Sequence, residues 1–266
     1  MKNKLKIILL IILSLGVVCI ISLSNDIKKE DSSTTKDDKM LSTDLLKRMN
    51  NKEDMLIYLT DNSAKCDSCL SIKKMLEFYE KRYDIKFIVF DISKRSDKDY
   101  KNLFKNFDNG FQNVEAPCVI YIKNGALHSS IISIPVEEMF RNMLIENNII
   151  DDNKYKNVEI PMTYSEYKKI EKSDNNELLL LTHIGDDGLS YILRDELLDL
   201  ALENNFSYRL VDIFSDDGRL IYYDLRKIKD DLGYNNPIVI FHNKKLIIYN
   251  EKNELKNFLI KNNIIN

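Results

Sequence analysis

The sequence is poor in several residue types that mark particular classes of protein. Its 266 residues include no tryptophan, three histidines and four cysteines, and the formal net charge at pH 7 is only −3. Lysine, arginine, aspartate and glutamate are interspersed along the chain, which leaves neither a basic patch for nucleic acid nor an acidic tail. We therefore expect no nucleic-acid partner. The missing tryptophan, in a chain rich in lysine, asparagine and isoleucine, is interpreted as a compositional bias of the host.

Apolar sequence, by contrast, is plentiful. Apolar residues make up 44% of the chain, ample for a packed core, and 266 residues suffice for one large domain or two ordinary ones. An uncharged run from residue 7 to residue 23 follows lysines at positions 2, 4 and 6. A helix of this length reaches about 25 Å, which is the short end of what spans a bilayer.

A cleaved signal peptide and a lipoprotein signal are the alternatives for this N-terminal run. The apolar core is longer than that of a typical signal peptide, and Ser22-Leu23-Ser24 is a poor cleavage site. The residues before Cys19 do not resemble a lipobox. We therefore predict that residues 1–24 form an uncleaved, single-pass transmembrane signal anchor in the cell membrane, with the N-terminus in the cytoplasm by the positive-inside rule. The rest of the chain is then expected on the extracytoplasmic side, where disulfides persist.

Beyond this predicted anchor the sequence divides into a tether and two similar segments. Residues 25–40 are polar and have no hydrophobic period, as expected of a linker. Residues 41–150 and 151–266 then repeat one order of elements: helix, strand, helix, strand, helix, strand, strand, helix. The motifs VFDIS and LVDIF lie 121 residues apart, and APCVIYI and NPIVIFH lie 120 apart. This internal duplication predicts two domains of one architecture.

Strand pairing follows from the order of the elements. Alternating strands and helices imply parallel pairing, whereas the closing hairpin, marked by Asn124-Gly125, must be antiparallel. Unbroken apolar runs indicate buried central strands. The predicted fold class is therefore α/β, with a mixed sheet flanked by helices in each segment. The predicted helices span about 41–50, 69–83, 97–107, 136–149, 163–172, 189–204, 218–231 and 252–262, and the predicted strands 54–60, 85–93, 116–124, 126–133, 177–183, 206–214, 236–243 and 245–250.

A pair of cysteines marks the candidate site. Cys66 and Cys69 come after the first strand of the first segment, where the next helix begins. A helix start offers unpaired N–H groups and the positive end of the helix dipole, and both stabilise a thiolate. We therefore expect Cys66 to have a lowered pKa and to be the attacking sulfur. Cys69, one helical turn later, is close enough to resolve a mixed disulfide.

Two other uses of the cysteine pair are weighed against redox chemistry. A zinc site needs two more ligands, and the candidates in this segment, Cys118 and His128, lie on separate strands without the spacing of a ligand pair. A purely structural disulfide of this kind closes a small ring, which removes little entropy from the unfolded chain. The position after a strand and at a helix start favours redox chemistry over both. Neither a metal nor another cofactor is expected.

Together these residues resemble the thioredoxin family. CDSC between a strand and a helix, Pro117 at the start of PCVIYIKNG, and the closing hairpin and helix are similar to a thioredoxin-fold domain. The resemblance implies that Cys66 is the nucleophile and Cys69 the resolving thiol. It implies a cis peptide bond before Pro117, which would pack beside the disulfide, and a role for Ala116 in presenting backbone groups to a substrate strand. By resemblance alone, the bond before Pro237 is also expected to be cis.

The resemblance covers residues 41–150 and, as a fold only, residues 158–266. It has departures next to the cysteines. Lys65 stands where thioredoxins usually have tryptophan, and Asp67-Ser68 is neither the Gly-Pro of reductants nor the Pro-His of strong oxidants. Lys65 favours a thiolate on Cys66, whereas Asp67 opposes it, so the direction of the redox reaction is left open.

The second segment lacks this chemistry. Gly185-Asp186-Asp187-Gly188 stands where the cysteine pair would be, and no cysteine follows Cys118. The two aspartates are interpreted as a cap of the first helical turn, and His183 and His242 as ordinary polar positions. Cys118 is either close to the redox site or, in the interpretation we favour, a buried small side chain in a strand.

The sequence therefore predicts a membrane-tethered, extracytoplasmic thiol–disulfide oxidoreductase with a redox-inactive second domain that binds clients or the first domain. Its expected partners are proteins with thiols or disulfides, the membrane through residues 7–23, and a redox partner protein. A different class stays open: a non-catalytic thioredoxin-fold protein for interaction or assembly, similar to accessories of secretion systems in Gram-positive bacteria. The absent tryptophan and the inactive second segment favour that alternative.

Overall fold

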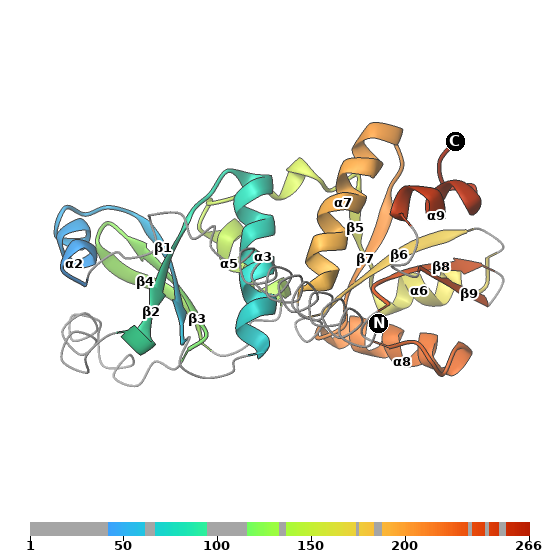
Figure 1. The fold of residues 1–266 in the computed structure, drawn as a ribbon, viewed down its shortest axis with the longest axis horizontal. Helices are drawn as coiled ribbons and strands as arrows, with labels where there is room; N and C mark the ends of the chain where they lie inside the picture. The colour runs from blue at the N-terminus through green and yellow to red at the C-terminus, as the bar shows by residue number, and fades with distance from the viewer. Residues whose placement is uncertain are drawn as a thin grey trace, which may run out of the picture. The chain divides into compact units, whose positions relative to one another are not determined.

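The computed structural model describes the chain from residue 42 onward, with gaps. Leu41–Asn266 forms one compact unit, in which helices flank two mixed sheets (Figure 1). The predicted anchor and tether lie outside the described residues, and so does the predicted helix 97–107. None of the described helices combines the length and the apolar character that a bilayer span requires. The described ranges are 42–61, 67–94, 116–132, 137–173, 176–183, 188–233, 236–242, 245–249 and 254–266.

The described strands of the first segment form a four-stranded sheet. In chain order the elements are α2 (Ser42–Asn50), β1 (Met55–Thr60), α3 (Asp67–Tyr83), β2 (Phe87–Asp91), a short 3-10 helix (Ile92–Lys94), β3 (Cys118–Lys123), β4 (Ala126–Ile132) and α5 (Glu137–Glu146). The strand order is β2-β1-β3-β4. β1 pairs in parallel with β2 and antiparallel with β3, which forms the antiparallel hairpin with β4.

The second segment repeats this sheet and adds one strand. Its elements are a short 3-10 helix (Asp152–Lys154), β5 (Glu159–Pro161), α6 (Tyr164–Ile170), β6 (Glu177–Thr182), α7 (Leu189–Asn204), β7 (Tyr208–Asp212), α8 (Asp216–Ile228), β8 (Ile238–His242), β9 (Lys245–Ile248) and α9 (Leu255–Lys261). The strand order is β5-β7-β6-β8-β9. The part β7-β6-β8-β9 matches β2-β1-β3-β4 in order and direction.

The predicted α/β class with a mixed sheet in each segment is confirmed, and the described helices and strands end close to the predicted positions. The exception is β5, which the sequence pattern does not predict. Its three residues are too short to show a period, and they form a strand because they pair in parallel with β7 at the sheet edge. Pro161 is tolerated there because an edge strand can lack one backbone donor.

The apolar runs account for the faces that each helix buries. Leu56, Tyr58 and Val119 of the first sheet pack in one cluster with side chains of α3 and α5, including Met75 and Phe140. In the second sheet one face packs against α7 and α9, and the other packs against α6 and α8. Every residue of β1 is buried, which explains its unbroken apolar sequence. Full burial of one such aliphatic or aromatic side chain contributes about 1.5–3 kcal/mol.

The hairpin between β3 and β4 requires its glycine. Asn124 and Gly125 both have positive φ, at 52° and 75°, as the predicted two-residue turn demands. A Cβ at Gly125 would lie 1.9 Å from the carbonyl oxygen of Met49, so no other residue fits without moving the backbone. The Asn124 N–H donates to the Asp54 carboxylate at 2.6 Å, which fixes the turn to the start of β1.

Candidate functional site

The candidate site lies at the end of the two central strands of the first sheet, where β1 ends and β3 begins. This end of the sheet is called the first edge below. Leu59 of β1 is paired with Cys118 of β3, and Thr60 is paired with Asp91 at the end of β2. α3 begins at Asp67, shortly after β1 ends. The topology therefore brings the start of α3 and the peptide before Cys118 to one edge of the sheet.

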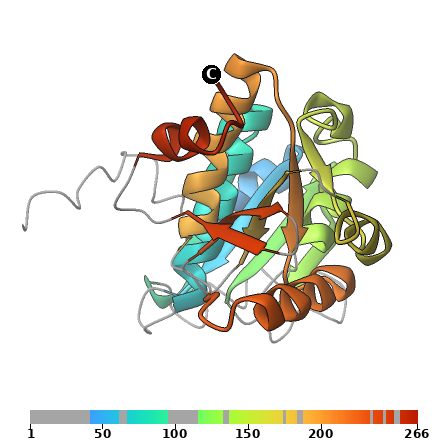
Figure 2. The ribbon, with the colours of Figure 1, turned by 90° about the vertical axis from the view of Figure 1, so that its right-hand side faces the viewer.

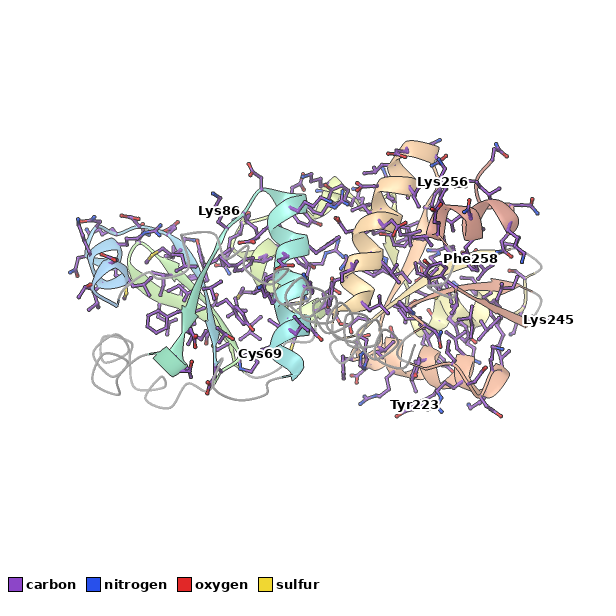
Figure 3. The ribbon with its side chains drawn as sticks, viewed as in Figure 1. Cys69, Lys86, Tyr223, Lys245, Lys256 and Phe258 are labelled. Carbon is purple, nitrogen blue, oxygen red and sulfur yellow. The ribbon has the colours of Figure 1, made fainter. Side chains whose placement is uncertain are left out.

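Cys69 lies in the first turn of α3 (Figure 3), and it is disulfide-bonded. Its side chain is only 8% exposed. The Tyr58 hydroxyl, from β1, donates a hydrogen bond to the carbonyl oxygen of Cys69 at 3.2 Å. Burial raises the pKa of Tyr58 to about 12, so this donor keeps its proton at neutral pH. The start of the helix is thus fastened to the sheet beneath it.

The other members of the predicted site fall partly outside the described residues. Lys65 and Cys66 lie there, whereas Asp67 and Ser68 are the first residues of α3. Cys118 is a free thiol, so the disulfide partner of Cys69 is not among the described residues. Within the described part of the chain, no three histidine, cysteine, aspartate or glutamate side chains converge in a way that could hold a metal ion.

The peptide bond between Ala116 and Pro117 is cis, as the resemblance implies. Pro117 is buried and Ala116 is half-buried, immediately before β3. The expectation for Pro237 is wrong, because the bond before Pro117 is the one cis bond among the described residues. X–Pro bonds are trans unless the surrounding structure favours the other isomer. The carbonyl oxygen of Pro237 accepts a hydrogen bond from the Leu181 N–H at 2.6 Å.

Cys118 is a core residue next to the site. Its side chain is buried in β3, and its thiol donates a long hydrogen bond to the Val119 carbonyl at 3.8 Å. Burial raises the pKa of the Cys118 thiol to about 12. The interpretation of Cys118 as a buried small side chain is confirmed, and a thiol of this kind stays protonated and unreactive at neutral pH.

The matching end of the second sheet, where β6 ends and β8 begins, is called the second edge, and it carries a buried histidine. The backbone N–H of His183 donates to the Ser190 hydroxyl, which in turn donates to the backbone carbonyl of His183, both at 3.2 Å. The imidazole stacks on Phe214 with ring centres 5.1 Å apart. Burial lowers the pKa of His183 to about 4, so the ring is neutral at pH 7. Asp186 and Asp187, predicted to cap the first turn of the helix that is α7, lie outside the described residues, as does the side chain of His242.

Asp212, at the end of β7, connects this second edge to the first segment. Its carboxylate accepts hydrogen bonds from the Phe214 N–H at 3.0 Å and from the Glu138 N–H at 3.4 Å. Glu138 belongs to the first turn of α5, so a side chain of the second segment satisfies a donor at a helix start of the first. Burial, together with the charge of Glu137, raises the pKa of Asp212 to about 6.

A buried ionic cluster around Arg194 was not predicted from the sequence. Arg194 is bonded to Glu137 and Glu159, and all three side chains are buried. A signal was present in the sequence, since Arg194 lies on one helical stripe with Tyr191 and Leu198, both of which are apolar. An arginine inside an apolar stripe predicts a buried acidic partner, but the sequence does not identify that partner.

Comparison with known proteins finds solved structures only. No protein-family model and no curated protein matches the chain. Thioredoxin O2 from Arabidopsis thaliana in the oxidized state is 13% identical, with 45% of this chain and 100% of that chain covered and a TM-score of 0.32. The first two thioredoxin domains of Saccharomyces cerevisiae Eps1p are 12% identical, with 81% and 92% covered and a TM-score of 0.28.

A third similar structure is the zinc-bound form of human ERp44. It is 10% identical, with 85% of this chain and 57% of that chain covered and a TM-score of 0.29. This chain therefore spans little more than half the length of the ERp44 chain. Because all three TM-scores lie below 0.5, the fold described above rests on the strand order and helix placement of this chain alone.

Proposed function

We propose that the protein is a thiol–disulfide oxidoreductase that acts on protein disulfides through Cys66 and Cys69. The observation that carries this proposal is the bonding state of the cysteines: Cys69, in the first turn of α3, is disulfide-bonded, while Cys118 on the adjacent β3 is a free, buried thiol. In the proposal Cys66 is the partner of Cys69. Cys66 immediately precedes α3, where helix N–H groups and the helix dipole stabilise a thiolate.

The proposed reaction is a pair of sulfur displacements. The Cys66 thiolate attacks one sulfur of a substrate disulfide, that S–S bond breaks, and the other substrate sulfur leaves as a thiolate and takes up a proton. The Cys69 thiolate then attacks the Cys66 sulfur of the mixed disulfide and releases the second substrate thiol. The substrate has gained two electrons and the pair is oxidised. A dithiol on a redox partner protein regenerates the pair, and the same steps in reverse oxidise a substrate.

Other residues at this edge have supporting roles in the proposal. Backbone groups of Ala116, beside the cis bond to Pro117, would bind an extended substrate strand. Lys65, Asp67 and Ser68 would set the stability of the Cys66 thiolate, as the residues between and before such a pair do.

The location of the chain is also a proposal. Residues 7–23 would hold it in the cell membrane as a single span with a cytoplasmic N-terminus, so that both segments face the extracytoplasmic side. Protease added to intact protoplasts should then digest both segments of the full-length protein, and the N-terminus should be recovered intact in the membrane fraction. Recovery of a soluble protein that begins after Ser24 would contradict this topology.

The test of the chemistry is substrate trapping. Cys69→Ser removes the resolving thiol, so we expect this variant to accumulate mixed disulfides through Cys66. Cys66→Ser should trap few or none. Cys118→Ser is the matched control within the same segment, and it should exchange disulfides like the wild type because Cys118 is buried and protonated. Reduction of insulin disulfides and the reduction potential of residues 41–266 measure the same activity directly.

The competing function is a non-catalytic interaction or assembly module. The observation that favours it is two exposed apolar side chains near the second edge, Met139 at 58% and Phe214 at 44% exposed. If Cys69→Ser captures no partner and the wild type neither reduces nor oxidises a test disulfide, the oxidoreductase proposal fails. The interaction module would then be the better assignment.

A further inference from the structure

Helix α7 of the second segment lies along α3 of the first, as both views show (Figures 1 and 2). A Cβ at Gly188, just before α7, would lie 2.4 Å from the side-chain Cγ of Lys74 in α3. Near the other end, Arg82 of α3 donates hydrogen bonds to Asp195 and Asp199 of α7. Residue numbers rise together along the two helices, so they run in the same direction and touch over most of the length of α3.

The contact between α3 and α7 is part of the core. Tyr191 and Leu198 of α7 are buried in the same cluster as Met75 and Tyr79 of α3. Arg194 lies between them on the same stripe of α7, and its guanidinium carbon is 4.3 Å from the centre of the Phe78 ring. The first segment therefore completes its core with side chains that the second segment supplies.

Arg194 is bonded to one carboxylate from each segment. Its side chain is 1% exposed, that of Glu137 in α5 is 4% exposed, and that of Glu159 in β5 is 2% exposed. Its Nε and one terminal nitrogen donate to Glu159 at 2.7 and 3.1 Å, while the other terminal nitrogen donates to Glu137. Glu159 belongs to the same segment as Arg194, whereas Glu137 belongs to the other.

Tyrosine hydroxyls also donate hydrogen bonds to the two carboxylates. Glu137 accepts from Tyr79 at 3.0 Å and from Tyr191 at 3.3 Å, and Glu159 accepts from Tyr208. Burial alone would raise the pKa of Glu137, but the Arg194 guanidinium and these hydrogen bonds outweigh it, and the pKa lies below its ordinary value. Glu137 is therefore ionised next to Arg194, and removal of Arg194 would leave this carboxylate as a buried charge without its partner.

The connection between the segments is packed against the same helix. The Lys154 ammonium and the Tyr155 hydroxyl both donate to the Arg82 carbonyl, the latter at 3.1 Å. The ammonium also lies 5.5 Å from the centre of the Tyr83 ring, and Tyr83 and Tyr155 meet edge to face. This linker covers the end of α3 and does not behave as a free tether between two domains.

We infer that the second segment is a fixed structural partner of the first, latched by Arg194 across Glu137 and Glu159, and that the two segments unfold in a single transition. The helix that carries Cys69 is held along its length by a segment that has no cysteine of its own. This role is independent of the proposed redox chemistry, because it follows from the buried contacts alone.

Double-mutant cycles on residues 41–266, unfolded in urea, test the latch. Arg194→Met leaves two buried carboxylates and should raise the unfolding equilibrium constant by about 10²–10³-fold. Combined with Glu137→Gln, it should show a coupling of at least about tenfold across the segments. Glu159→Gln with Arg194→Met is the matched pair within one segment. Coupling to Glu159 with none to Glu137 would overturn the inference, as would two separate unfolding transitions.

A half-buried control and a second variant complete the test. Arg209→Met removes a half-buried arginine, 3.5 Å from Glu177, and should change the unfolding constant less than about fivefold. If Arg194→Met does not fold, Arg194→Lys keeps the charge but loses the forked geometry. Hydrogen exchange of this variant should accelerate in α3 and α5 as well as in α7. Acceleration confined to the second segment would equally overturn the inference.

Discussion

The two sheets end in edges of one topology but of different chemistry. After Thr60, at the end of β1, the chain enters a helix whose first turn holds the disulfide-bonded Cys69. After Thr182, at the end of β6, comes a neutral, buried His183, whose backbone is hydrogen-bonded to the hydroxyl of Ser190 in α7 and whose ring stacks on Phe214. The strand order is shared, so it cannot determine the chemistry. The few residues between strand and helix do so.

The closing helices of the two segments, in contrast, have similar sequences and similar packing. MLIENNII at 143–150 and FLIKNNII at 258–265 are related by an offset of 115 residues. Leu144 and Leu259, at corresponding positions, are both fully buried. The duplicated core has been retained where the edges have diverged, which is expected if packing and chemistry are constrained at different positions. Each prediction below tests one side of this comparison.

The largest expected effect separates reactive from unreactive thiols at the first edge. After reduction of residues 41–266, alkylation at pH 8 should label Cys66 first and Cys118 at least about 10³-fold more slowly. The reason is that burial raises the pKa of Cys118 to about 12, which leaves about one thiolate in 10⁴ at this pH. Peptide mass spectrometry over a time course measures both rates. In 8 M urea the two rates should converge, and equal rates in the folded protein would break the comparison.

The second prediction concerns the shared closing helices. Leu144→Ala and Leu259→Ala should each lower the free energy of unfolding by about 2–5 kcal/mol, because both side chains are fully buried. Urea unfolding of residues 41–266 measures both. Leu202→Ala, at an exposed position of α7, is the control and should change it by less than about 0.5 kcal/mol. A large cost at one leucine and none at the other would show that the two cores are not equivalent.

The third prediction is the pH dependence of the second edge, where two groups oppose each other. The pKa of Asp212 rises from 3.8 to about 6 on folding, so its contribution to stability grows as pH falls from 6 to 4. The pKa of His183 falls from 6.5 to about 4, so its contribution is lost as pH falls over nearly the same window. Each is about 3 kcal/mol at most, and together they nearly cancel.

Single variants should separate the opposite pH dependences of Asp212 and His183. Asp212→Asn removes the gain, so the free energy of unfolding should fall between pH 6.5 and pH 4 more steeply than in the wild type. His183→Gln removes the loss, so the free energy of unfolding of this variant should rise as the pH falls from 6.5 to 4. Urea unfolding at half-unit steps of pH measures the slopes. Equal slopes in the two variants would mean that these residues do not titrate as described.

The smallest expected effect concerns the turn after each closing helix. Asn148 and Asn263 have φ of 56° and 57°, the left-handed conformation that asparagine tolerates and alanine does not. Asn148→Ala and Asn263→Ala should each cost about 1 kcal/mol, seen as a lower thermal midpoint. Replacement by glycine should leave stability within about 0.5 kcal/mol of the wild type, because glycine adopts this conformation without strain. An alanine variant as stable as its glycine counterpart would contradict this explanation.

Much of the fold could be predicted because its signals are local. Alternation, helical period and the Asn124-Gly125 turn depend on neighbours in the chain, and the two repeats supplied the same pattern twice. The start of α3 next to Cys69 followed from the same signals. β5 could not be predicted, since a three-residue strand exists only through its pairing with β7. The non-cis bond before Pro237 also escaped the sequence, because resemblance was its sole basis.

The sequence by itself determined the elements other than β5, their order, the duplication and the position of the cysteine pair. The tertiary structure alone decided which charges are buried together and which side chains change their protonation. Arg194 is bonded to Glu137 and Glu159, residues 57 and 35 positions away, and no local pattern links them. The altered pKa values of His183 and Asp212 likewise arise from burial among distant groups. Desolvation and charge pairing depend on distance in space, which the chain acquires only when it has folded.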